Sequence, residues 1–160
     1  MTINKDNINA MTDCEKVAVF CGSFDPYTIG HDDILRRFLP LFDKIIVGVG
    51  YNEHKQCLLT GKERVEQIKA VYKDEPKVEV QEYAVLTVDF ARENNARYII
   101  KGVRSVKDYE YEREQAEANR MLAPEIETLV LFASAEKAIV SSSLVRELKH
   151  FGKDISQWLP

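Results

Sequence analysis

The stretch GSFDPYTIGH, residues 22–31, joins an apolar run to a predicted helix. The run before it, VAVFC at residues 17–21, is typical of a strand that is buried on both faces of a parallel sheet. The helix after it is expected at residues 32–39. The glycines of the stretch would let the backbone approach a ligand closely. His31 would lie in the first helical turn, where free N–H groups and the macrodipole favour an anion. Together these features predict a phosphate site.

The rest of the chain alternates between predicted strands and predicted helices. The later strands are expected at residues 44–49, 78–83, 98–100 and 128–132. The later helices are expected from a Thr-x-x-Glu capping box at residues 60–63 to the break at Pro76, and at residues 88–94, 108–122 and 144–148, with one more helical turn within 154–159. This alternation predicts an α/β fold, a Rossmann-like, doubly wound, five-stranded parallel sheet with helices on both faces, in a single domain.

Length and composition are those of one soluble globular domain. The chain has 160 residues, enough for one hydrophobic core, and we assign residues 14–160 to the domain and residues 1–13 to a flexible N-terminal tail. A net charge of −4 argues against general binding to nucleic acid or to an anionic membrane. An odd count of 3 cysteines, no apolar signal segment and no run of transmembrane length predict a cytoplasmic protein.

Three segments with phosphate-binding chemistry follow predicted strands, namely residues 22–31, 101–104 and 141–143. In a doubly wound sheet, ligands bind beyond the carboxyl ends of the strands, where the strand order reverses. We therefore expect the three segments to meet in one site. Their glycines match neither the Walker loop nor the dinucleotide-binding pattern Gly-x-Gly-x-x-Gly. For the first segment taken alone, an ordinary connector is the alternative interpretation.

The same segments resemble the motifs of a known family. Residues 22–31 are similar to the signature of the adenylyltransferase and cytidylyltransferase superfamily. Residues 101–112, KGVRSVKDYEYE, and residues 140–147, VSSSLVRE, are similar to two segments of the phosphopantetheine adenylyltransferases. The likeness extends from about residue 17 to residue 160. The sequence is therefore identified as a member of that family.

The resemblance implies a reaction and an assembly. ATP and 4′-phosphopantetheine would give dephospho-coenzyme A and pyrophosphate, which is the penultimate step of coenzyme A biosynthesis. Mg²⁺ would be held mainly by the ATP phosphates, and no protein ligand for it is assigned. Coenzyme A would be a candidate feedback ligand, and the protein would be a homohexamer.

The nucleophile in this reaction would be the phosphate of the substrate. It is already anionic at neutral pH, so the protein need not supply a general base. The protein must instead align the phosphates and stabilise charge on the α-phosphate and on the leaving pyrophosphate. The resemblance assigns this catalytic role to His31, Lys55 and Arg104. A histidine that only caps its own helix is the alternative for His31.

The resemblance also assigns two sets of binding residues. The ATP-binding residues are Ser23, Phe24, His31, Gly102, Val103, Arg104, Glu112, Lys137, Ala138, Ile139, Val140, Ser141, Ser142 and Ser143. The substrate-binding residues are Ser23, Lys55, Thr87 and Lys101, and Thr87 is also a candidate cap for the helix at 88–94. Lys101 stands where arginine is usual, so it keeps the charge and loses the bidentate fork. Lys137 stands where an aromatic residue is common.

Two other functions are alternatives. The fold could belong to a nucleotidyltransferase with another acceptor, such as nicotinate mononucleotide. It could also belong to a catalytically silent regulator that binds a nucleotide or coenzyme A. The segments at 101–112 and 141–147 argue against the first alternative, and intact His31, Lys55 and Arg104 argue against the second.

Overall fold

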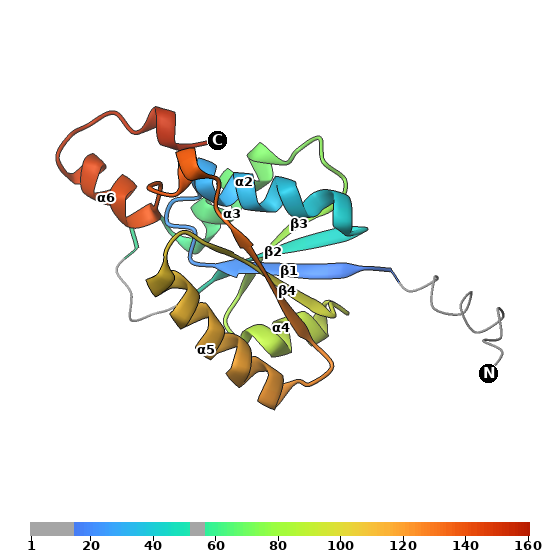
Figure 1. Ribbon diagram of the computed structural model, residues 1–160. Helices are drawn as coiled ribbons and strands as arrows, with labels where there is room; N and C mark the ends of the chain where they lie inside the picture. The colour runs from blue at the N-terminus through green and yellow to red at the C-terminus, as the bar shows by residue number, and fades with distance from the viewer. Residues whose placement is uncertain (1–14, 52–56) are drawn as a thin grey trace, which may run out of the picture.

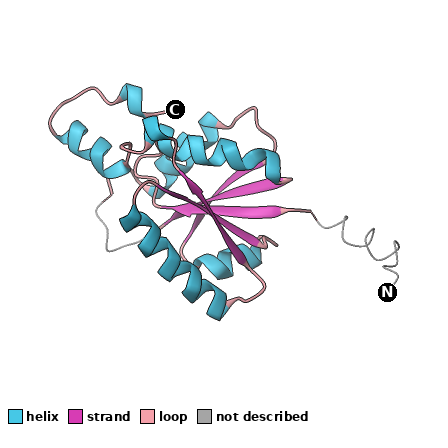
Figure 2. Ribbon diagram, in the orientation of Figure 1, coloured by secondary structure: helices cyan, strands magenta, loops and turns pink. Residues whose placement is uncertain are grey.

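Parallel strands form one sheet in the part of the chain that the computed structural model describes, residues 15–51 and 57–160 (Figures 1 and 2). The strands are β1 (Val17–Gly22), β2 (Lys44–Gly50), β3 (Val78–Tyr83), β4 (Tyr98–Val103) and β5 (Glu127–Phe132). Their order across the sheet is β3-β2-β1-β4-β5, and every neighbouring pair is parallel. The predicted doubly wound sheet is therefore confirmed, and its strand order reverses between β1 and β4.

Helices connect these strands and follow the last of them. They are α2 (Ile29–Phe38), α3 (Gly61–Val71), α4 (Thr87–Glu93), α5 (Val106–Leu122) and α6 (Ser142–His150), with the short 3₁₀ helices η1 (Leu39–Leu41), η2 (Ala135–Lys137) and η3 (Ser156–Trp158). None of the helices in the described ranges is both long enough and apolar enough to cross a membrane. The tail at residues 1–13 lies outside the described residues and stays a prediction.

Three of the element boundaries that differ from the predicted ones affect the site residues. Helix α2 begins three residues earlier, because Thr28 is its N-cap. Thr87 is the first residue of α4 and Leu86 is the N-cap, so the prediction that Thr87 caps this helix was wrong. Strand β4 continues to Val103, because residues 101–103 pair with β5. These three residues therefore belong to the strand itself and not to a turn after it.

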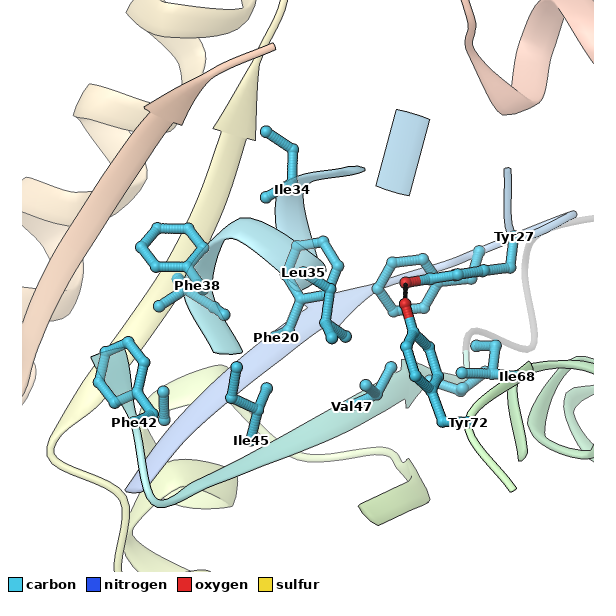
Figure 3. Close-up of a cluster of buried hydrophobic side chains, with 14 of the residues drawn as sticks. Phe20, Tyr27, Ile34, Leu35, Phe38, Phe42, Ile45, Val47, Ile68 and Tyr72 are labelled. Atoms are coloured by element: carbon cyan, nitrogen blue, oxygen red, sulfur yellow. Dashed lines mark hydrogen bonds between the residues drawn. The ribbon is translucent and has the colours of Figure 1, made fainter. Parts of the chain in front are cut away.

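Alternate residues of the central strands face hydrophobic clusters on opposite sides of the sheet. On one side, Phe20 and Val47 pack with Leu35 of α2, and α3 joins the same cluster (Figure 3). On the other side, Val19 packs with Phe90 of α4. Each of these side chains is at most 4% exposed. The central strands are thus buried on both faces, as their continuous apolar sequences predict, and the helices hold the carboxyl ends of β1 and β4 in place.

Gly48 of β2 lies where this packing leaves no room for a side chain. A Cβ atom there would lie 2.7 Å from Cε1 of Phe90 and 2.9 Å from Sγ of Cys21. Because both neighbours are buried, we expect Gly48→Ala to lower the free energy of unfolding by about 1–3 kcal/mol, measured by urea denaturation. Gly50→Ala is the matched control on the same strand, since its Cβ would lie 3.6 Å from the nearest atom. Equal losses in the two variants would contradict this explanation.

Candidate active site

A cavity of about 420 Å³ opens at the carboxyl ends of β1 and β4, where the strand order reverses. Doubly wound sheets bind their ligands at this position. The predicted site residues that line the cavity are Ser23, Phe24, His31, Lys101, Gly102, Arg104, Glu112, Lys137, Val140, Ser141, Ser142 and Ser143. The three segments singled out in the sequence therefore meet in one place.

Of the remaining predicted residues, those within the described ranges do not line this cavity. Val103 is buried at the end of β4, and residues 138–139 belong to the turn after η2. Thr87 lies beyond the carboxyl end of β3, with its hydroxyl oxygen 3.4 Å from that of Tyr83. Lys55 lies outside the described residues, so its predicted role stays a prediction.

Two polar residues of the cavity wall, Asp108 and Tyr111, were missed by the sequence analysis. Both lie on α5, four residues and one residue before Glu112. Residues three and four positions apart share one face of a helix, so the spacing of Asp108 from Glu112 is the signal that could have found it. Tyr111 is three residues beyond Asp108 on the same face. Helix α5 therefore contributes a polar face to the cavity.

Two buried charged residues hold the loop that contains Ser23. The carboxylate of Asp25, 4% exposed, accepts the backbone N–H groups of Leu58 at 2.7 Å and Leu59 at 2.9 Å. The guanidinium of Arg64, 2% exposed, donates to the backbone carbonyl of Ser23. Buried charges are stable only when they are paired or hydrogen-bonded in this way. Asp25 thus ties the loop of the motif to the chain just before α3.

The imidazole of His31 is fixed by the N-terminus of its own helix. His31 is the third residue of α2, and its Nδ1 accepts the backbone N–H of Thr28 at 3.0 Å. The hydroxyl oxygen of Thr28 lies 3.0 Å from the same nitrogen. Because Nδ1 is an acceptor, the neutral ring carries its proton on Nε2. Nδ1 therefore does cap the helix, as the alternative interpretation of His31 expects. Nε2–H is not used in the cap, so it is available to donate to a ligand in the cavity that His31 lines.

The protonation of His31 should appear in the pH dependence of stability. Burial, together with the positive charge of Arg104, lowers the pKa of His31 from 6.5 to about 4. The unfolded chain keeps the ordinary pKa, so as the pH falls it binds this proton before the folded protein does. We expect the stability that neutral His31 provides to be fully present above pH 6.5. The free energy of unfolding should then fall progressively down to about pH 4, by up to about 3 kcal/mol.

The measurement compares urea unfolding of the parent protein and His31→Gln across this pH range. Glutamine at the third helical position can still accept the Thr28 N–H, as in a capping box, so the variant removes the titrating group and keeps the cap. The parent should lose more stability than the variant between pH 6.5 and pH 4. Identical losses would show that His31 is not responsible.

Two cations of the cavity are already paired with carboxylates of α5. Nζ of Lys101 lies 3.4 Å from Oε2 of Glu112. Nε of Arg104 lies 2.9 Å from Oδ2 of Asp108, and a second guanidinium nitrogen lies 3.3 Å from Oδ1. An anionic ligand must therefore compete with these carboxylates for both cations.

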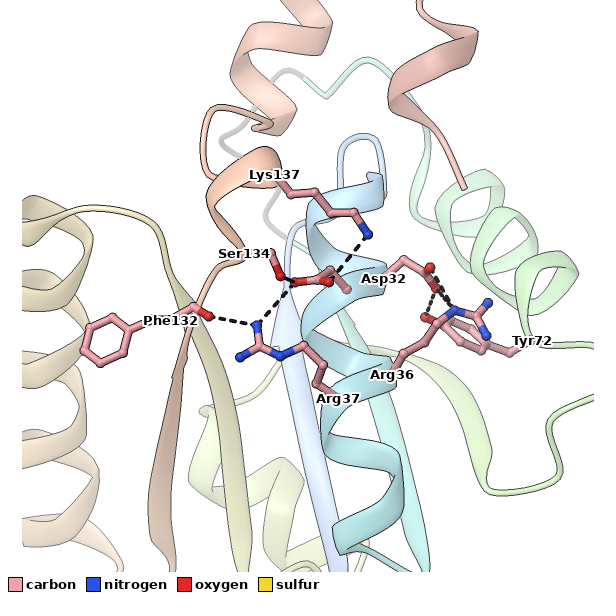
Figure 4. Close-up of polar contacts among 8 residues, drawn as sticks. Asp32, Arg36, Arg37, Tyr72, Phe132, Ser134 and Lys137 are labelled. Carbon is pink, nitrogen blue, oxygen red and sulfur yellow. Dashed lines mark hydrogen bonds and ion pairs between the residues drawn. The ribbon is translucent and has the colours of Figure 1, made fainter.

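A third ion pair fastens the loop after β5 to α2 (Figure 4). Oδ1 of Asp33 lies 3.5 Å from Nζ of Lys137, and Oδ2 accepts the hydroxyl of Ser134 at 2.8 Å. Arg37 donates to the same carboxylate at 3.3 Å and to the carbonyl of Phe132 at 2.8 Å. These hydrogen bonds lower the pKa of Asp33 against the opposing effect of its partial burial. The segment that holds Lys137 is thus tied to the helix that holds His31.

The three serines of the last motif form the start of α6. Ser141 is the N-cap, and its hydroxyl oxygen accepts the N–H of Leu144 at 3.1 Å. The hydroxyl of Ser142 donates to the carbonyl of Pro26 at 2.8 Å. The hydroxyl oxygen of Ser143 accepts a guanidinium N–H of Arg146 at 3.1 Å. The side chains therefore position the helix, while its N-terminus adds a favourable field for an anion in the cavity.

Among residues 15–51 and 57–160, no group of three or more histidine, cysteine, aspartate or glutamate side chains could hold a metal ion.

Comparisons with known proteins indicate the family of the chain. The cytidylyltransferase-like family matches residues 19–148. The chain is 48% identical to the phosphopantetheine adenylyltransferase of Bacteroides fragilis over 143 residues, which covers 89% of this chain and 95% of the relative. It is 46% identical to the phosphopantetheine adenylyltransferase of Caldanaerobacter subterraneus subsp. tengcongensis, with 91% of each chain covered.

A solved structure shares the fold at low sequence identity. It is a bifunctional NMN adenylyltransferase/ADP ribose pyrophosphatase from Francisella tularensis, complexed with AMP and a manganese ion. The TM-score is 0.68 at 15% identity, over 91% of this chain and 44% of that chain. The high identity to the curated relatives over nearly their whole length carries the assignment. The chain belongs to the phosphopantetheine adenylyltransferase family.

Proposed function

We propose that the protein transfers the adenylyl group of ATP to 4′-phosphopantetheine, giving dephospho-coenzyme A and pyrophosphate. Membership of the family supports the reaction class and the acceptor. The observation that carries the proposal in this chain is the state of His31, a neutral imidazole whose Nδ1 is occupied and whose Nε2–H is available. It lines a cavity that also contains Lys101 and Arg104, as a site for two phosphorylated substrates requires.

The transfer is one in-line displacement. An oxygen of the acceptor phosphate forms a bond to the α-phosphorus of ATP, while the bond from that phosphorus to the bridging oxygen of the β-phosphate breaks. Pyrophosphate leaves with the electron pair of that bond, and no proton need be removed from the nucleophile. His31 donates from Nε2 to a non-bridging oxygen of the α-phosphate, where charge develops in the transition state. Arg104 and the N-terminus of α6 bind the other ATP phosphates.

The remaining roles follow the predicted assignments. The other predicted ATP-binding residues that line the cavity surround the nucleotide, and Ser23 and Lys101 contact the acceptor, with Lys55 and Thr87 completing its site. Glu112 is a suitable acceptor for a nucleotide hydroxyl. In the described ranges its Oε2 is buried and has no hydrogen-bond partner, although Lys101 lies 3.4 Å away. Buried oxygens without a partner are uncommon in proteins, and a nucleotide hydroxyl would supply the missing hydrogen bond here.

The nucleotide substrate in this proposal is the complex of ATP with a divalent metal, Mg²⁺. The ion would enter on the phosphates of ATP, where it neutralises charge and helps to align the triphosphate. The reaction would take place in the cytoplasm, with coenzyme A as a feedback ligand of the same cavity.

The proposal includes a homohexamer, and exposed apolar side chains support an assembly. Helix α5 buries none of its residues within one chain, and Met121 near its end is 86% exposed. Strand β5 lies at the edge of the sheet, where Phe132 is 72% exposed. Apolar surface of this kind commonly marks an interface between subunits. Sedimentation equilibrium of the full chain measures the stoichiometry, and a monomer at micromolar concentration would refute this part.

The test of the reaction is pyrophosphate release from the purified protein with ATP and Mg²⁺. One sample receives 4′-phosphopantetheine and the other receives nicotinate mononucleotide as the rival acceptor. We expect release only with 4′-phosphopantetheine, together with dephospho-coenzyme A as product. Release only with the rival would overturn the acceptor and keep the mechanism. No release with either, from folded protein that binds ATP, would favour the silent regulator.

A further inference from the structure

Tyr27 and Tyr72 form a buried, hydrogen-bonded pair between α2 and α3 (Figure 3). Their hydroxyl oxygens are 2.8 Å apart. The hydroxyl of Tyr72 also lies 2.6 Å from Oδ1 of Asp32, to which it donates (Figure 4). Because that proton is used on the carboxylate, the Tyr72 oxygen accepts from Tyr27. Asp32 is itself held by Nε of Arg36 at 2.8 and 2.9 Å. The hydrogen bonds therefore run in one direction, from Tyr27 through Tyr72 to Asp32, and they end on a carboxylate that Arg36 holds in place.

The ring of Tyr27 lies against the imidazole of His31. The two ring centroids are 5.3 Å apart, and the planes are inclined by only 26°. Phe24 meets the same imidazole at 5.1 Å with its plane at 90°. Tyr27 is 0% exposed, so its ring cannot turn away without opening the core. The imidazole thus has a flat aromatic wall along one face, in addition to the hydrogen bond at Nδ1.

The backbone of Tyr27 is held as well. The side-chain carbonyl of Gln67 on α3 lies 3.4 Å from its N–H, and the amide nitrogen of Gln67 lies 3.5 Å from its carbonyl oxygen. An aliphatic residue would fill the same space without burying a hydroxyl, which is unfavourable unless that hydroxyl is hydrogen-bonded. The polar contacts of Tyr27 therefore indicate more than packing.

We propose that Tyr27 is a positioning residue for His31: its ring sets the plane of the imidazole, and the hydrogen bonds through Tyr72 to Asp32 hold that ring in place. The contacts at Nδ1 all come from Thr28 and by themselves leave the imidazole free to tilt, and a donor that tilts misses the developing charge on a phosphate. The wall removes that freedom before the substrate arrives. This inference rests on the proposed role of His31 in adenylyl transfer.

Two variants test the inference. Tyr27→Leu removes the aromatic wall, and we expect kcat to fall about tenfold. The KM values for ATP and 4′-phosphopantetheine should stay within about twofold, because Tyr27 does not line the cavity. The double variant Tyr27→Phe/Tyr72→Phe removes both hydroxyls and keeps both rings. Asp32 loses the Tyr72 donor but keeps the guanidinium of Arg36, so the fold should survive. Its kcat should fall about threefold. Tyr98→Phe is the control, since that ring packs on Phe42.

The deciding measurement is the ¹⁵N NMR spectrum of the His31 imidazole at neutral pH, which reports the tautomer without any turnover. In the parent we expect one tautomer with the proton on Nε2, because Nδ1 accepts the Thr28 N–H. A ring that tilts out of its plane loses this hydrogen bond, so in both test variants we expect signals averaged between two tautomers. If the proposed adenylyl transfer were wrong, the parent protein would show no turnover. The NMR signals would still report whether Tyr27 positions the imidazole of His31. Unchanged signals in folded Tyr27→Leu overturn the inference. If that variant does not fold, the double variant decides by the same criterion.

Discussion

Replacing His31 by alanine should lower kcat by about 10²–10³-fold, the usual loss when one preorganised donor to a developing charge is removed. The Kd for ATP should change by less than about threefold, because the donor acts mainly in the transition state. Stopped-flow turnover and calorimetric titration with ATP measure the two effects separately. The alanine variant also loses the acceptor for the Thr28 N–H, so part of its phenotype could be attributed to the helix terminus.

The variant His31→Gln separates the loss of the catalytic donor from the loss of the helix cap. Its side chain restores an acceptor for Thr28 and should recover the stability that alanine loses, while turnover should stay well below that of the parent. His150→Gln is the control at a histidine of α6 away from the cavity, and it should behave as the parent does. Near-normal turnover in both His31 variants would remove His31 from the mechanism.

Replacing Arg104 by methionine should raise the Kd for ATP by about 10–100-fold, the range expected for losing a charge-assisted hydrogen bond to phosphate. Two effects contribute to this loss. The guanidinium no longer binds the phosphates, and Asp108, its partner at 2.9 Å, becomes an unpaired negative charge in the wall of the cavity. That charge repels the triphosphate.

The double variant Arg104→Met/Asp108→Asn isolates the second effect. It removes the repelling carboxylate, so it should bind ATP about threefold more tightly than Arg104→Met and still more weakly than the parent. Arg97→Met is the matched control, because Arg97 is exposed just before β4, at the end of the strand away from the cavity. A change of less than threefold in Arg104→Met, or an equal loss in Arg97→Met, would exclude Arg104 from the ATP site.

Local patterns predicted the architecture and most of the cavity. The continuous apolar run of β1 and the helix after it are neighbours in sequence, so their relation to His31 follows from strand, turn and cap chemistry. The carboxyl ends of parallel strands share one edge of a sheet, which is why distant motifs such as Arg104 and Ser141 meet. The extension of β4 to Val103 could not be predicted in this way, because it depends on pairing with β5.

The contacts that support the site were missed because they join residues far apart in the chain. Tyr27 and Tyr72 are 45 positions apart, and Ser134 lies 101 positions from Asp33. Arg64 belongs to α3, where a surface position would be the ordinary expectation for arginine, yet it is buried under the Ser23 loop. No periodicity reports such pairs. Only the packed chain brings them together.

The ion pairs of Lys101 with Glu112 and of Arg104 with Asp108 mean that the cavity contains its own counterions. A small monovalent anion such as chloride would have to displace a carboxylate that is covalently anchored beside each cation, and it has too little charge to do so. The phosphates of ATP and of the acceptor each carry more than one negative charge and engage several donors at once, so ATP can displace Asp108 from Arg104 and the acceptor can displace Glu112 from Lys101. The site therefore discriminates by the number of charges that a ligand presents, before it recognises the shape of any base or acceptor.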